Sequence, residues 1–97
     1  MLHLIADSTL TQAVVERIAI GDDVVLLASV LAVAYAGHQD NAHLQTLLSR
    51  SCSIYALSDQ LAMNGIGDTE LFPGVQVIDY PKLVDLTVHN PVIHTWC

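Results

Sequence analysis

One uninterrupted apolar run restricts the fold of this chain more than any other feature. Residues 24–28 read Val-Val-Leu-Leu-Ala, with no polar side chain among them. A strand that has one face in water alternates apolar and polar residues, so a strand without alternation is covered on both faces. Such strands are typical of parallel sheets, in which helices pack against both faces. The run therefore predicts a buried strand of an α/β protein.

The other apolar segments alternate between strand and helix patterns along the chain. Short apolar runs predict the strands, at residues 2–6, 24–28, 53–57 and 75–79, with 92–96 as the candidate for a fifth. Helical spacing and cap residues predict the helices, at residues 10–20, 30–36, 42–50, 60–63 and 82–88. Alternation of this kind, with right-handed crossovers, predicts a three-layer α/β fold around a parallel sheet of four or five strands. At this length we expect a single domain over residues 1–97.

The charge balance argues against direct binding of nucleic acid. The formal net charge is −7, and the only fixed cations are Arg17, Arg50 and Lys82. Binding to RNA or DNA draws its affinity from several contacts between cationic side chains and phosphates. Only 13% of the residues are charged and 53% are hydrophobic, whereas average chains carry about 25% charged residues. We therefore expect part of the apolar surface to lie against a protein partner.

The longest uncharged stretch does not predict a membrane segment. Its apolar part, residues 24–37, is shorter than the roughly 20 residues that span a bilayer. It follows Asp22 and Asp23, whereas a signal peptide has a basic flank. We expect a cytoplasmic protein that makes no membrane contact, in which Cys52 and Cys97 are reduced thiols.

Parallel α/β proteins bind ligands beyond the carboxyl ends of their strands, so the residues that follow each strand are the first candidates for a site. Residues 7–9 read Asp-Ser-Thr, and they are explained as helix N-caps. Ser29 lacks the flanking glycines of a hydrolase nucleophile, and Ser58 is also explained as a cap. No glycine-rich phosphate loop is present, and we expect no cofactor.

The cysteines are the candidate nucleophiles. Cys52 precedes a strand at the amino end of the sheet, and only Arg50 lies near it in the sequence, so we expect a buried or incidental thiol. Cys97 is the remaining catalytic candidate, although Thr95 and Trp96 offer it no activation.

The histidines and acidic residues do not form a recognisable metal or acid–base pattern. The histidines are expected on the surface or facing a partner; they are His3, His38, His43, His89 and His94. The spacing between His38 and His43 fits no ligand motif, and His89, His94 and Cys97 converge only if the tail folds back. The acidic residues Asp68, Glu70, Asp79 and Asp85 describe a solvated surface, and we expect no metal site. The residues alone thus favour an interaction subunit whose chemistry belongs to a partner.

Short blocks that together form a recognisable set are spread over nearly the whole chain. The most specific block joins Val77-Ile78-Asp79-Tyr80 to Leu83-Val84-Asp85-Leu86-Thr87, with Trp96 after it. The other blocks are Met1-Leu-His-Leu, Gly21-Asp22 before the run at 24–27, Tyr55-Ala56-Leu57, and Asp59 with Leu61-Ala62-Met63-Asn64-Gly65. In this order the blocks resemble the TusB/DsrH family of sulfur-relay subunits.

The resemblance implies a DsrE/F-like fold and a non-catalytic, structural role. It implies a cytoplasmic complex with TusC-like and TusD-like subunits, two copies of each chain, which takes persulfide sulfur from carrier proteins for 2-thiolation of the tRNA wobble uridine. In that family the essential cysteine lies on the D-type subunit. This chain therefore is not expected to be an enzyme on its own.

Three departures from the family pattern bear on this assignment. Some DsrH-type relatives carry a cysteine on the first helix, where this chain has Val14, which favours the tRNA branch. Relatives often have a Gln/Glu-Asp-Gly turn where this chain has Ala28-Ser29-Val30, and Cys97 beyond Trp96 is unusual. Two alternatives remain: a DsrH-like subunit of a sulfur-oxidation complex that carries persulfide itself, and a stand-alone α/β domain that binds a small ligand.

Overall fold

The computed structural model describes residues 1–6, 11–27, 41–63, 65–67 and 70–96. Their strands form one five-stranded parallel sheet in the order β4-β3-β2-β1-β5. The strands are β1 (Leu2–Ile5), β2 (Asp23–Leu26), β3 (Ser53–Leu57), β4 (Val75–Ile78) and β5 (Ile93–Trp96). The helices are α1 (Gln12–Arg17), α2 (Asn41–Ser49), α3 (Ser58–Met63) and α4 (Tyr80–His89).

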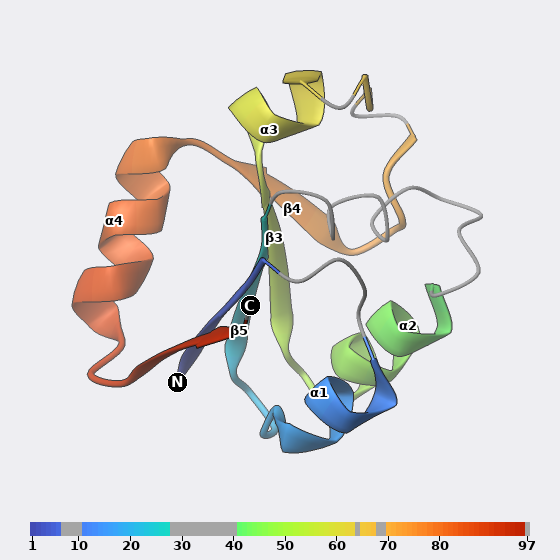
Figure 1. Ribbon diagram of the computed structural model, residues 1–97, viewed down its shortest axis with the longest axis vertical. Helices are drawn as coiled ribbons and strands as arrows, with labels where there is room; N and C mark the ends of the chain where they lie inside the picture. Colours follow the sequence, from blue (N-terminus) through green and yellow to red (C-terminus); the bar gives the residue numbers. More distant parts are fainter. Residues whose placement is uncertain (7–10, 28–40, 64, 68–69, 97) are drawn as a thin grey trace.

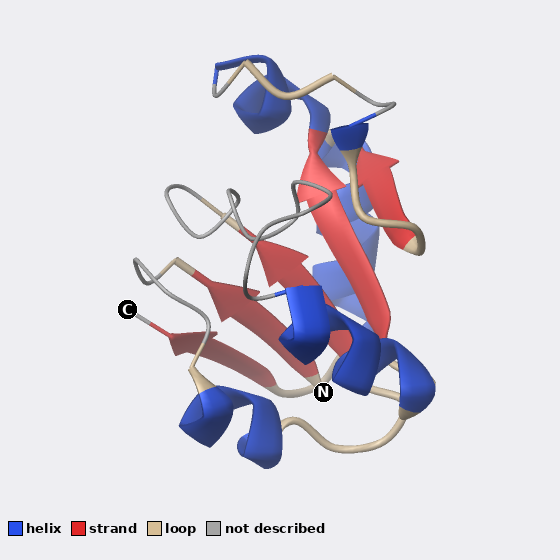
Figure 2. Cartoon of the chain, turned by 90° about the vertical axis from the view of Figure 1, so that its right-hand side faces the viewer, coloured by secondary structure: helices blue, strands red, loops and turns tan. Residues whose placement is uncertain are grey.

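Helices cover both faces of the sheet, as the sequence predicts. Figure 1 shows α4 on one side of the strands and α1 with α2 on the other. In Figure 2, turned by 90°, α1 and α2 lie in front of the strands. The expected three-layer parallel α/β architecture is therefore confirmed, and the fifth strand is present at the β1 edge.

Two apolar clusters, one on each face, hold the layers together. The cluster under α1 and α2 is the larger, and Leu44 and Leu47 of α2 have no exposed surface. The cluster under α4 contains Leu86, which packs with residues of β1 to β4. Burial on both faces explains why the run beginning at residue 24 shows no alternation: Val24 and Leu26 belong to the first cluster, and Val25 belongs to the second.

The first helix is shorter than predicted, and the cause is the carboxylate of Asp22. The helix was expected over 10–20 with Gly21 as its stop, yet α1 ends at Arg17, and Ile18 is already extended, with φ −86° and ψ 122°. The Ala19 amide donates to Asp22 Oδ2 at 3.0 Å and is thereby taken from the helical pattern. Gly21 instead occupies the following turn with φ +82°, which favours glycine.

The last helix begins earlier than the expected range 82–88, because Asp79 caps it. The Asp79 side chain accepts a hydrogen bond from the Lys82 amide at 3.0 Å. Pro81 lies in the first turn, where its missing N–H costs nothing. The helix predicted over 30–36 lies outside the described residues. None of the helices in the described ranges has the length and apolar character needed to cross a membrane.

Candidate functional site

The expected sites at the carboxyl ends of the strands are only partly visible. Residues 7–9 and Ser29 lie outside the described part of the chain. Ser58 is exposed and is the first residue of α3, directly after β3. Among the described residues the most developed polar site lies elsewhere, beside the edge strand β5.

A buried histidine joins three segments that are distant in the sequence. His3, in β1, is 1% exposed and lies on the face of the sheet that carries α1 and α2. Its Nε2 is 2.8 Å from Asp22 Oδ2, just before β2. Its Nδ1 is 3.1 Å from the indole Nε1 of Trp96, near the end of β5. Strand register explains the approach, because β1 and β5 pair His3 with His94 and Ile5 with Trp96.

The Trp96 contact defines which nitrogen of His3 carries the proton. An indole N–H only donates, so Nδ1 of His3 must accept and holds no proton. Nε2 then bears the hydrogen and donates to Asp22. Both ring nitrogens are occupied, which means that His3 is a structural link and not a free acid or base. The expectation that the histidines lie on the surface is wrong for His3, because its hydrogen-bond partners permit burial.

Asp22 is the acceptor on which this cluster depends. Besides His3, it accepts from the Ala19 amide, and its Oδ1 lies 3.3 Å from the amino group of Met1. Burial opposes its ionisation, but the hydrogen bonds from His3, Ala19 and Met1 outweigh that effect and hold the pKa of Asp22 below its usual value. Asp22 is therefore an anion surrounded by donors, in a position where a neutral side chain would leave them unpaired.

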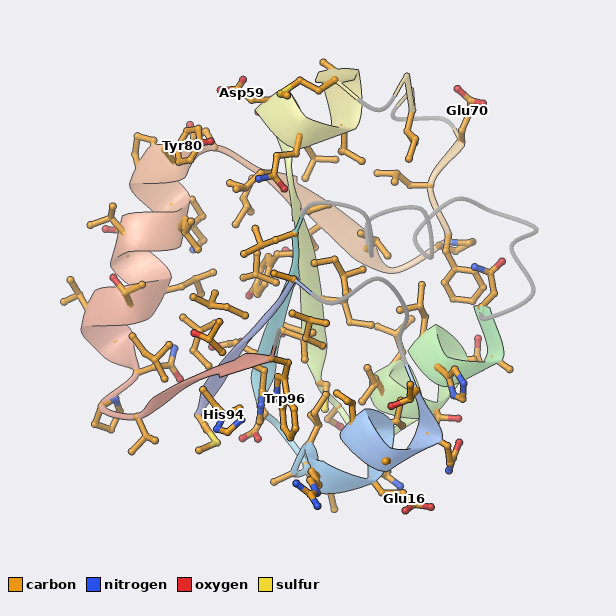
Figure 3. All side chains as sticks on the ribbon, in the orientation of Figure 1. Glu16, Asp59, Glu70, Tyr80, His94 and Trp96 are labelled. Carbon is orange, nitrogen blue, oxygen red and sulfur yellow. The ribbon has the colours of Figure 1, made fainter. Side chains whose placement is uncertain are left out.

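A shallow depression of about 200 Å³ opens next to this cluster. Met1, His3, Arg17, His94 and Trp96 line it. The His94 and Trp96 rings lie 4.2 Å apart, and Figure 3 shows both at the β5 edge. The Arg17 guanidinium carbon is 5.9 Å from the centre of the Trp96 ring, within reach of a cation–π contact. The depression thus combines aromatic rings with a cation.

Cys52 is buried, as predicted, and its environment keeps it protonated. Its Sγ donates to the carbonyl of Ala19 at 3.3 Å. Burial raises the pKa of the Cys52 thiol, and the amides of Gly21 and Asp22 offset this only in part. A thiol of this kind is a poor nucleophile, because the thiolate is the reactive form. Cys97 lies outside the described residues.

The remaining histidines and acids are placed as follows. His38 and Asp68 lie outside the described residues, and no three His, Cys, Asp or Glu side chains of the described part gather as metal ligands. His89 contacts the Asp85 carbonyl within α4. Glu70 accepts from the Gly67 amide, so it closes a turn.

Trp96→Phe tests the indole hydrogen bond to His3. Phenylalanine keeps an aromatic ring at the edge but leaves His3 Nδ1 without its donor, so we expect the free energy of unfolding to fall by about 1–2 kcal/mol. Urea denaturation followed by circular dichroism measures the change. The matched control is Tyr80→Phe, an exposed aromatic of α4 that should unfold as the wild type does. Equal stability of Trp96→Phe and wild type would contradict the proposed link.

The described chain is a small parallel α/β protein with a buried His–Asp link. A family model described as DsrH like protein matches residues 6–92. The chain belongs to the TusB/DsrH family.

Curated relatives agree with this assignment, and a solved structure shares the fold. The chain is 37% identical to Protein TusB of Buchnera aphidicola over 75 residues, 77% of this chain and 75% of that one. It is 30% identical to Protein TusB of Erwinia tasmaniensis over 99 residues, 99% of this chain and all of that one. The crystal structure of the ychN protein from E. coli has the same fold, with a TM-score of 0.79 at 11% identity, over 98% of this chain and 97% of that chain.

The buried cluster explains why three of the family's sequence blocks occur together in this chain. The blocks around His3, Asp22 and Trp96 are weak signals when each is taken alone. In the structure these three side chains form one hydrogen-bonded chain. Three separate sequence blocks therefore contribute to one hydrogen-bonded chain, which links β5 to the start of β1 and of β2.

Proposed function

We propose that this chain is a non-catalytic, structural subunit of a cytoplasmic sulfur-relay complex that supports 2-thiolation of the tRNA wobble uridine. Its partners in this proposal are TusC-like and TusD-like subunits, two of each with two copies of this chain. The observation that carries the proposal is membership of the TusB/DsrH family. The buried thiol of Cys52 supports the structural role.

The chemistry of sulfur relay explains why Cys52 bears on that role. In each step a thiolate attacks the outer sulfur of a persulfide, a new S–S bond forms, and the donor leaves as a thiolate. The step needs an accessible thiolate, whereas Cys52 is 4% exposed and burial raises its pKa. In this proposal the acceptor cysteine belongs to a partner subunit, and the sulfur carriers meet this chain only indirectly.

The net charge of the chain supports a role in which it does not bind the tRNA itself. With a net charge of −7, direct binding to the tRNA phosphates is unfavourable. Arg50, one of the three fixed cations, is used internally: its guanidinium donates to the carbonyls of Val15 and Ile18. The tRNA is accordingly left to a downstream enzyme.

The proposal is tested first by native mass. Light scattering is performed on this chain alone and after co-expression with the C-type and D-type subunits of the same genome. A stable assembly of about six chains is the expected result for the co-expressed sample. Failure of the three chains to associate would overturn the assignment to a relay complex.

The two cysteines give a second test, on activity. Replacing Cys52 and Cys97 together by serine should leave sulfur transfer through the reconstituted complex unchanged, because the relay cysteine is expected on a partner. Transfer is measured with labelled sulfur on each subunit separated without reductant. Loss of transfer in the variant, or reductant-labile label on this chain in the wild-type complex, would instead support the alternative in which this subunit carries persulfide itself. The D-type cysteine replaced by serine is the control that should abolish transfer.

A further inference from the structure

One lining residue of the depression beside β5, Arg17, carries a positive charge that no carboxylate in the described part of the chain neutralises. Arg17 has no carboxylate partner among the described residues, and its guanidinium lies over the Trp96 ring. The preceding acid, Glu16, is hydrogen-bonded to Gln12, and Figure 3 shows it pointing away from Trp96. In a protein with a net charge of −7, an arginine beside a half-buried tryptophan and an exposed histidine is a distinctive local charge.

The other groups of the depression also favour an oxyanion. Asp22, the acid next to it, already accepts from His3, from the Ala19 amide and from the Met1 amino group. His94 is exposed, its ring centroid lies 4.2 Å from that of Trp96, and its imidazole supplies an N–H donor. A guanidinium presents a planar fork of N–H groups that matches a carboxylate. A carboxylate therefore complements the charge and the geometry of the depression.

The size and the rim of the depression indicate a side chain of another protein. About 200 Å³ is less than the volume typical of sites for whole small-molecule ligands, roughly 300–1,000 Å³. Met1, one of the lining residues, is a large apolar side chain with 45% of its surface exposed. Tryptophan and arginine, both present in this depression, are enriched among the residues that contribute most to binding at protein interfaces. β5 is also an edge strand of the described sheet, with one side open to another chain.

We propose that this depression is a docking site that receives an aspartate or glutamate side chain from a partner polypeptide, held between Arg17 and His94 against the Trp96 ring. The inference rests on the proposed function, in which other subunits cover this chain, and it adds which surface one of them uses. The exposed part of Met1 would be buried by the backbone and side chains that flank the acidic residue.

The first experiment compares variants in the co-expressed complex. Arg17→Glu reverses the charge, and Arg17→Met with His94→Leu removes the side-chain donors. We expect each to weaken association by at least about ten-fold, with circular dichroism of the isolated chain unchanged. Lys82→Glu, which alters an exposed cation on α4, is the matched control and should assemble as the wild type does. Wild-type assembly by Arg17→Glu would overturn the inference and leave the proposed function intact.

The second experiment uses the isolated chain, so it decides the inference even if the complex does not form. Trp96 is the only tryptophan, and its fluorescence therefore reports on the depression directly. A short peptide with one central glutamate should produce a saturable change, which disappears with the glutamine peptide and with Arg17→Gln. No response to the glutamate peptide would overturn the inference. Acetate acting at the same concentrations as the peptide would also overturn it, because the site would then accept free anions and not a polypeptide.

Discussion

Asp22→Ala is expected to lower the free energy of unfolding by about 3 kcal/mol. The substitution leaves the buried N–H of His3 and the amide of Ala19 without an acceptor, and a buried donor without a partner is costly. It also releases the contact with the Met1 amino group. Chemical denaturation at neutral pH measures the loss. Asp85→Ala, which removes an exposed acid of α4, is the control and should change stability by less than about 0.5 kcal/mol.

The same pair of proteins should show a defined pH dependence. The pKa of Asp22 is lower in the folded chain than its ordinary value of 3.8, so the folded state favours the ionised form. The stabilisation from ionised Asp22 is therefore fully present above the ordinary pKa and is lost as the pH falls through the folded pKa. The stability difference between wild type and Asp22→Ala should be constant above about pH 5 and should shrink below about pH 4. A difference that grows on acidification would contradict this account of Asp22.

Leu47→Ala is the second large effect, at about 3 kcal/mol. Leu47 has no exposed surface and lies where α2 packs on the sheet, in the larger apolar cluster. Truncation removes buried methyl groups and leaves a cavity that a close-packed interior fills only in part, with typical costs of 2–5 kcal/mol. The midpoint of urea denaturation, followed by Trp96 fluorescence, measures the loss.

The neighbouring leucine is the matched control for that prediction. Leu48 is half-buried and packs at the border of the same cluster, against the turn at Gly74. Leu48→Ala should therefore cost about half as much as Leu47→Ala or less. Equal losses from the two variants would show that α2 packs differently from the arrangement described above.

The fold could be predicted largely because a strand that is buried on both faces has a recognisable sequence pattern, an apolar run without alternation. The run at residues 24–28 lacks alternation since Val24 and Val25 face different apolar clusters. The ends of the elements were less predictable, because they depend on contacts with distant side chains. The first helix was expected to continue to residue 20, but the carboxylate of Asp22 captures the Ala19 amide and ends it early.

The site at the β5 edge was not predicted, because its members lie far apart in the sequence. His3 and Trp96 are 93 residues apart, and only the pairing of β1 with β5 brings them together. A signal was nevertheless present. A histidine inside an apolar strand that is covered on both faces is buried, and a buried imidazole needs a partner for each nitrogen. Asp22 and Trp96 are residues of the required types, an acceptor and a donor.

The neighbouring positions of β1 and β5 have a consequence for the order of folding. Pairing these strands joins segments of the greatest sequence separation in the described sheet, so the entropy of closing that loop opposes it until β1 to β4 have condensed. During synthesis, which proceeds from the amino end, β1 emerges long before β5. Before β5 pairs, water takes the place of Trp96 at Nδ1 of His3, and we expect the edge strand β5 to be the last part of the sheet to form.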